Sequence, residues 1–223
     1  MDDQSKRRFR FLAISGALFV ALWFLWNTPF VYPVKLFVVL LHEISHGLAT
    51  LATGGEILAI DVTPREGGSC RCPGGNAFVG LSAGYLGSLL WGGLMIWGAE
   101  RFPAFSAWLA GAIAVTVGTV TVVFVREPFA AAFGLAFAAA LLVVAWRGGW
   151  KVSRWVLTIL GLISCLYAVL DIKSDILDRP ELKSDARMLA ELTGVPTLVW
   201  GGIWIAVALL FCFLLFRWAW RRA

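Results

Sequence analysis

Seven apolar segments, each about 20 residues long, occupy most of this chain of 223 residues. A helix of that length crosses the hydrocarbon core of a bilayer, where only helices and closed barrels satisfy their backbone groups. Apolar residues make up 60% of the chain and charged residues 15%, which is too little charge for a soluble domain of this size. The sequence therefore predicts an all-α polytopic membrane protein with about seven transmembrane helices, folded as a single domain over residues 1–223. The predicted segments are Phe9–Trp26, Val34–Thr53, Phe78–Trp97, Phe105–Val125, Phe129–Trp146, Val152–Leu170 and Leu198–Trp218.

The basic residues lie mostly at the two ends of the chain, which predicts membrane topology and headgroup contact and excludes nucleic-acid binding. Four of them within the first ten residues predict a cytoplasmic N-terminus, in a multi-pass protein of the plasma membrane. With seven segments, the C-terminal arginines would lie on the outer side of the membrane, whereas basic residues usually lie on the cytoplasmic side. Six segments would put these arginines on the cytoplasmic side, but Asp171 and the end of the second segment would then lie on opposite sides of the membrane. Seven is favoured, with the fourth and fifth segments forming either a tight hairpin or a partly re-entrant unit.

The two histidines of the chain lie four residues apart inside the second apolar segment, in His42-Glu43-Ile44-Ser45-His46. Positions i and i+4 share one face of a helix, so both imidazoles can bind one metal ion while Glu43 reaches a water molecule on it. Two histidines that merely satisfy each other would leave Glu43 buried without a reason. Ionisable groups inside a membrane segment indicate function, and the pattern predicts a site for one Zn²⁺ ion with Glu43 as the catalytic base.

A catalytic zinc ion takes three protein ligands, and the chain has no third histidine. A carboxylate or thiolate must therefore complete the set. Asp171 is the first choice because it ends the sixth apolar segment on a rigid element, and Asp175 follows one helical turn later. Asp185, Glu127 and a cysteine remain as alternatives.

Two polar stretches interrupt the apolar segments. Residues 54–77 alternate in hydrophobicity and contain turn residues, which predicts either a small β-hairpin at the membrane surface or a plain loop. Cys70 and Cys72 in this stretch are expected to be a reduced pair without a role. In the second stretch, Asp171–Pro196, Ser184 can cap a short amphipathic helix over Ala186–Leu192, which Thr193-Gly194 ends. The glycine-rich third segment predicts close packing against the histidine-bearing helix, with Ser88 as a weaker candidate for orienting a substrate carbonyl.

These motifs resemble the site-2 protease family of intramembrane zinc metallopeptidases, in particular its small peptidase-like bacterial and plant branch. The resemblance implies that His42 and His46 bind zinc, that Glu43 activates water, and that the aspartate of a Leu-Asp-Gly motif completes the site. Here Ile172 follows Leu170-Asp171 in place of the glycine, and the family's Asn-x-x-Pro element is absent. The segments that carry the resemblance are Leu41–Gly47, Gly54–Gly55, Ala83–Ser88, Leu170–Asp175 and Ser184–Ala186.

The resemblance also implies that the hairpin receives the substrate as an added strand, with Glu56–Thr63 as its counterpart here. The leading hypothesis is an intramembrane zinc endopeptidase that cleaves peptide bonds in or near transmembrane segments of other membrane proteins. Its expected partners are that substrate and the lipid bilayer, and the oligomeric state is left open. The alternative is a catalytically inactive membrane protein, either a metal-binding scaffold or a transporter.

Overall fold

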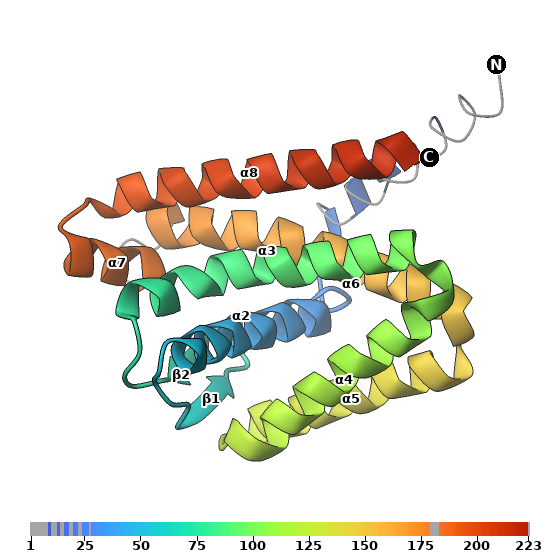
Figure 1. The fold of residues 1–223 in the computed structure, drawn as a ribbon, viewed down its shortest axis with the longest axis horizontal. Helices are drawn as coiled ribbons and strands as arrows, with labels where there is room; N and C mark the ends of the chain where they lie inside the picture. The colour runs from blue at the N-terminus through green and yellow to red at the C-terminus, as the bar shows by residue number, and fades with distance from the viewer. Residues whose placement is uncertain are drawn as a thin grey trace.

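A computed structural model describes residues 28–178 and 183–222, together with isolated positions between residues 9 and 26. The described part is helical apart from one small two-stranded sheet, and six of its helices are long and apolar enough to cross a membrane (Figure 1). This confirms the predicted all-α architecture with a small hairpin. Half of the predicted segment Phe9–Trp26 lies outside the described residues. The elements are α2 (Tyr32–Ala52), β1 (Ala59–Val62), β2 (Gly68–Arg71), α3 (Ala77–Arg101), α4 (Ser106–Phe124), α5 (Pro128–Arg147), α6 (Gly149–Lys173), α7 (Asp185–Thr193) and α8 (Thr197–Arg222).

Helix α3 packs between α2 and α6, and glycines set how closely the helices approach (Figure 1). A Cβ atom at Gly92 would lie 2.8 Å from the carbonyl oxygen of Gly161, and one at Gly161 would lie 2.7 Å from that of Gly92. The backbones of α3 and α6 are therefore in direct contact, as small residues allow in membrane helices. On the α2 side, Gly87 faces the Ser45 side chain. The predicted close packing of the glycine-rich segment on the histidine-bearing helix is confirmed.

Helices α4 and α5 form an antiparallel pair of full-length helices, which resolves the choice between a hairpin and a re-entrant unit in favour of the hairpin. Their connecting turn is attached to the sheet. The Asp61 Oδ1 atom on β1 accepts hydrogen bonds from the backbone N–H groups of Arg126 (3.3 Å) and Glu127 (3.0 Å). The Glu127 carboxylate in turn accepts from the Ala130 N–H and caps α5. Glu127 is thus a structural cap in this fold.

Strands β1 and β2 form an antiparallel hairpin that packs along α2. Near its base, Ile57 contacts α2 at Gly47, where an added Cβ would lie 2.7 Å from the Ile57 Cδ1 atom. Further along, Gly68 of β2 lies against Glu43, and an added Cβ there would lie 2.7 Å from the Glu43 Cγ atom. The hairpin therefore runs backwards along the helix, toward its N-terminal end.

The tip of the hairpin is held at the beginning of α2 by two polar contacts. The ammonium group of Lys35, a residue that is 5% exposed, lies 2.9 Å from the Glu66 carboxylate. The Tyr32 hydroxyl donates to the Pro64 carbonyl at 2.7 Å. Glu66 adopts a left-handed backbone conformation (φ 61°) that turns the chain back into β2. A buried lysine with a carboxylate partner avoids the cost of an unpaired charge.

The contacts from Tyr32 to Gly47 cover about 22 Å of the axis of α2. Most of the length of α2, a helix that could cross a membrane, is therefore lined by the hairpin. The expected location of the hairpin at the membrane surface stays a prediction. The hairpin packs on α2 because β1 carries apolar side chains on its inner face. Ile60 and Val62 are 0% and 1% exposed, and burying them against α2 removes apolar surface from water.

Candidate metal centre

His42 and His46 lie one turn apart on α2 and face the same side of the helix, as the i, i+4 spacing predicts. Their ring centroids are 4.8 Å apart. The Nδ1 atom of His46 lies 2.8 Å from the carbonyl oxygen of Gly80 on α3. Since a carbonyl only accepts hydrogen bonds, Nδ1 is the donor, and the lone pair of the neutral ring is on Nε2. The second ring nitrogen is thereby oriented toward the space between α2, α3 and α7.

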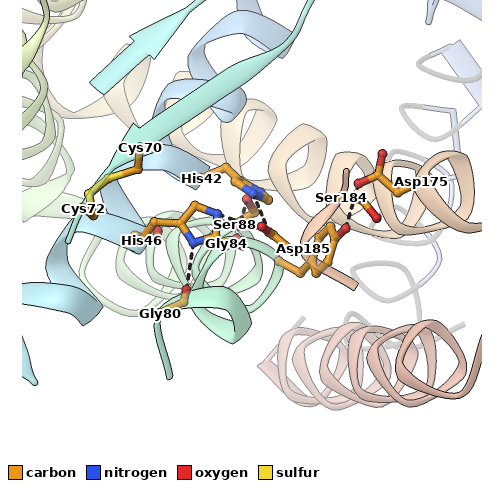
Figure 2. A network of polar contacts seen from close by, with 12 residues as sticks. His42, His46, Cys70, Cys72, Gly80, Gly84, Ser88, Asp175, Ser184 and Asp185 are labelled. Atoms are coloured by element: carbon orange, nitrogen blue, oxygen red, sulfur yellow. Dashed lines mark hydrogen bonds and ion pairs between the residues drawn. A yellow bond between two sulfur atoms is a disulfide. The ribbon is translucent and has the colours of Figure 1, made fainter. Parts of the chain in front are cut away.

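Asp185 supplies the carboxylate that faces both imidazoles (Figure 2). Its Oδ2 atom lies 3.1 Å from Nε2 of His42 and 3.2 Å from Nε2 of His46. Asp185 is the first residue of α7, whose N-cap is Ser184 and whose C-terminal end is the left-handed Gly194, as predicted for this helix.

The distances from the Asp185 oxygen to the two imidazole nitrogens fit the dimensions of a tetrahedral zinc site. Zinc binds histidine nitrogen and carboxylate oxygen at about 2.0–2.2 Å, which places neighbouring tetrahedral ligands about 3.3 Å apart. The two distances from the Asp185 oxygen to the imidazole nitrogens, 3.1 and 3.2 Å, lie close to this value. Two imidazoles and one carboxylate are also a donor set that catalytic zinc sites use. The residues present therefore fit this metal.

Gly84 on α3 leaves room beside the same nitrogen atoms. A Cβ atom at this position would collide with Nε2 of His42 and would lie 2.6 Å from Nε2 of His46. Glycine is thus required on this turn of α3 if both nitrogens are to remain accessible. Ser88, one turn later, is fully buried and donates its hydroxyl to the Gly84 carbonyl, so it packs within α3 and does not line the cavity at the site.

Glu43 lies beside the two histidines on the side of the hairpin. One ligand atom from each of His42, Glu43 and His46 lies within 4.8 Å of the others. A Cβ atom added at Gly68 on β2 would collide with the Glu43 carboxylate, and Glu43 is 6% exposed. A cavity of about 620 Å³ opens onto Glu43, both histidines, Asp185 and β2. A carboxylate next to a metal-binding pair and an accessible cavity has the arrangement that general-base catalysis requires.

The other candidates for the third ligand lie at different places. Asp171, the first choice from the sequence, lines the same cavity from α6, and its ligation of a metal stays a prediction. Asp175 accepts a hydrogen bond from the Tyr85 hydroxyl. Cys70 and Cys72 are joined in a disulfide, which contradicts the expected reduced pair and leaves neither as a thiolate ligand (Figure 2). The sequence contained a signal for Asp185, since Ser184 marks a helix start that makes Asp185 its first residue.

The fold and the site together define a polytopic membrane protein with a zinc-peptidase type of centre. The chain matches the family described as Peptidase M50B-like over residues 15–215, which is most of its length. It therefore belongs to this family, and the suspected membership of the site-2 protease family is confirmed: the protein is an integral membrane protein of the metallopeptidase kind. No curated protein matches the chain, and no solved structure matches it.

Proposed function

We propose that this protein is an active intramembrane zinc endopeptidase that hydrolyses peptide bonds in or near transmembrane segments of other membrane proteins. The observation that carries the proposal is that the Asp185 carboxylate lies within 3.2 Å of both imidazole nitrogens, with Glu43 beside them at a cavity. The family supports a membrane setting and membrane-protein substrates. The proposed location is the plasma membrane with a cytoplasmic N-terminus, as the basic N-terminal residues suggest.

One zinc ion would be held by His42, His46 and Asp185. This assignment replaces Asp171 by Asp185, because Asp185 is the carboxylate within hydrogen-bond distance of both imidazoles. Bound there, zinc would lower the pKa of a water molecule and polarise a peptide carbonyl. Gly80 supports the set by keeping His46 in the tautomer whose Nε2 atom carries the lone pair.

Glu43 would act as general base and then as general acid. Its carboxylate lies next to the histidines, where it can hold the attacking water, accept its proton and deliver that proton to the leaving amine. Because the side chain is nearly buried, its carboxylate has few competing contacts with bulk water. The contact between Glu43 and Gly68 also puts the proposed base directly beside β2.

The register of the hairpin favours β2 as the place where substrate binds, in place of the Glu56–Thr63 segment that the resemblance implies. The carbonyl groups of Gly67, Arg71 and Pro73 accept hydrogen bonds from the β1 side. Since N–H and C=O groups alternate along a strand, those of Gly68 and Cys70 point to the opposite edge. That edge has no neighbouring strand within the described part of the chain.

An unpaired strand edge beside a membrane helix requires water or another peptide as its partner, because lipid cannot satisfy backbone groups. A substrate segment added to β2 would gain hydrogen bonds there and would have to leave the helical conformation to form them. Its backbone would then pass Gly68 and reach Glu43. Strand addition thus explains how a helical peptide bond becomes accessible to the proposed base.

Proline at position 70 tests strand addition. Cys70→Pro removes one N–H group from the open edge of β2, a position at which an edge strand tolerates proline. We expect kcat/KM for a membrane substrate to fall about 3- to 10-fold, as for the loss of one hydrogen bond. Cys70→Ala is the matched control, because it also removes the disulfide but keeps the N–H group, and it should cleave faster than Cys70→Pro. Equal rates for the two variants would contradict pairing along this edge.

Metal removal tests the proposed function as a whole. The purified chain should contain about one zinc per molecule, and after reconstitution with single-span membrane proteins it should cleave at least one of them within or beside the span. A chelator should stop the cleavage, and added zinc should restore it. Undiminished cleavage by the zinc-free protein would refute the metal-dependent mechanism. A zinc-loaded chain that cleaves none of a broad panel would favour the inactive scaffold.

A further inference from the structure

Tyr85 is a fully buried residue that contacts the metal centre without belonging to the proposed ligand set. It follows Gly84 on α3 and is 1% exposed. Its ring meets the ring of His42 edge to face, with centroids 5.4 Å apart and an interplanar angle of 82°. Its hydroxyl donates to the Oδ2 atom of Asp175 at 2.7 Å. A polar group so deeply buried requires its partner, and here that partner lies on a different element.

Asp175 belongs to the π-helical turn Ser174–Asp178, which continues α6 at its C-terminal end. The chain passes from this turn to Ser184 and then to Asp185, the first residue of α7. The hydrogen bond from Tyr85 therefore attaches the end of α6 to α3 just before the chain returns to the metal centre.

The ring of Tyr85 also takes part in the packing that holds α7. It belongs to a small apolar cluster with Ile172 and Ile176 from the α6 end, Ala186 and Leu189 from α7, and Trp204 from α8. Helix α7 has nine residues, too few to be stable alone, so tertiary packing must determine where it lies. Ala186 directly follows Asp185, and a shift of the cluster would move the Asp185 carboxylate with it.

We infer that Tyr85 is a positioning residue that sets the distance of Asp185 from His42 and His46. Its ring contacts one proposed ligand, its hydroxyl holds the turn that leads to another, and its apolar face packs on the helix that carries that ligand. The inference rests on the proposed function only in taking Asp185 as a zinc ligand. Tyr85 does not touch the metal in this scheme and acts through Asp185.

The test measures metal binding by the full-length chain in detergent. Tyr85→Phe removes only the hydroxyl, and we expect the zinc dissociation constant to rise about 10- to 100-fold, as for other residues that orient metal ligands. The visible absorption of the Co²⁺-substituted protein should change, because it reports the geometry of the ligands. Asp175→Asn retains an oxygen acceptor for the hydroxyl, so it should bind zinc more tightly than Asp175→Leu.

A matched control separates positioning from general stability. Glu100 and Arg154 form an ion pair between α3 and α6, and Glu100→Gln disturbs the same two helices away from α7. This control should leave the zinc dissociation constant and the Co²⁺ spectrum unchanged. Tyr85→Phe should also add no further loss in an Asp175→Leu background, since both changes remove the same contact.

Two results would overturn the inference. One is a zinc dissociation constant of Tyr85→Phe within twofold of wild type together with an unchanged Co²⁺ spectrum. The other is a loss of zinc affinity that the Glu100→Gln control reproduces, which would assign only a structural role to Tyr85. If Asp185→Asn itself leaves zinc affinity intact, Asp185 is not a zinc ligand, and both the proposed ligand set and the role of Tyr85 are refuted. If that variant weakens binding but Tyr85→Phe does not, only the role of Tyr85 fails.

Discussion

The Glu43→Gln variant is expected to bind zinc as wild type does and to cleave its substrate about 10²- to 10⁴-fold more slowly. Glutamine has the same size as glutamate and can still hydrogen-bond to water, but its amide cannot accept the proton. The measurement is kcat in the reconstituted membrane assay together with zinc content. Because Glu43 is not one of the proposed ligands, its substitution should lower the cleavage rate and leave the zinc content unchanged.

Glu56→Gln is a suitable control for this variant, since it makes the same chemical change at an exposed position before β1. It should retain the wild-type rate. Turnover by Glu43→Gln at the rate of this control would remove Glu43 from the catalytic step, even if zinc proved essential.

Asp185→Asn is expected to weaken zinc binding more than any other carboxylate substitution in the cavity. The change removes the negative charge that lies within 3.2 Å of both imidazole nitrogens while keeping the size of the side chain. We expect the zinc dissociation constant to rise by more than the 10- to 100-fold that is typical of residues outside the ligand set. Competition with a chromogenic chelator measures it directly.

Asp171→Asn is the decisive comparison, because Asp171 lines the same cavity and is the ligand that the sequence favours. Its zinc dissociation constant should rise by no more than 10- to 100-fold over wild type. If Asp171→Asn loses zinc and Asp185→Asn keeps it, the ligand assignment made from the sequence is right, and the one made from the geometry must be withdrawn.

The sequence predicted those parts of the site that depend on local periodicity. His42, Glu43 and His46 lie within one helical segment, so the spacing alone puts both imidazoles on one face. Helix α7 was predicted from its capping residue Ser184 for the same reason, since a cap is a local signal. The turn residues likewise predicted the hairpin.

The sequence ranked Asp171 above Asp185 because Asp171 ends a long apolar segment, whereas Asp185 follows a polar connection whose path no local pattern describes. The structure places α7 by packing Ala186 and Leu189 against Tyr85, a residue about 100 positions away. A contact between residues so distant in the chain leaves no periodic signal. The packing of the hairpin on α2 was not predicted for a similar reason, since alternation indicates which face of a strand is apolar but not which helix will cover it.

The sequence by itself determined that the chain spans a membrane and that one of its helices presents two imidazoles and a carboxylate, because length, hydropathy and helical spacing are properties of contiguous residues. The tertiary structure alone decided which distant carboxylate meets the imidazoles and where the open edge of β2 lies relative to Glu43. Those placements depend on how closely α2, α3 and α7 approach, which is set by the space that Gly84 and Gly68 leave and by the packing around Tyr85.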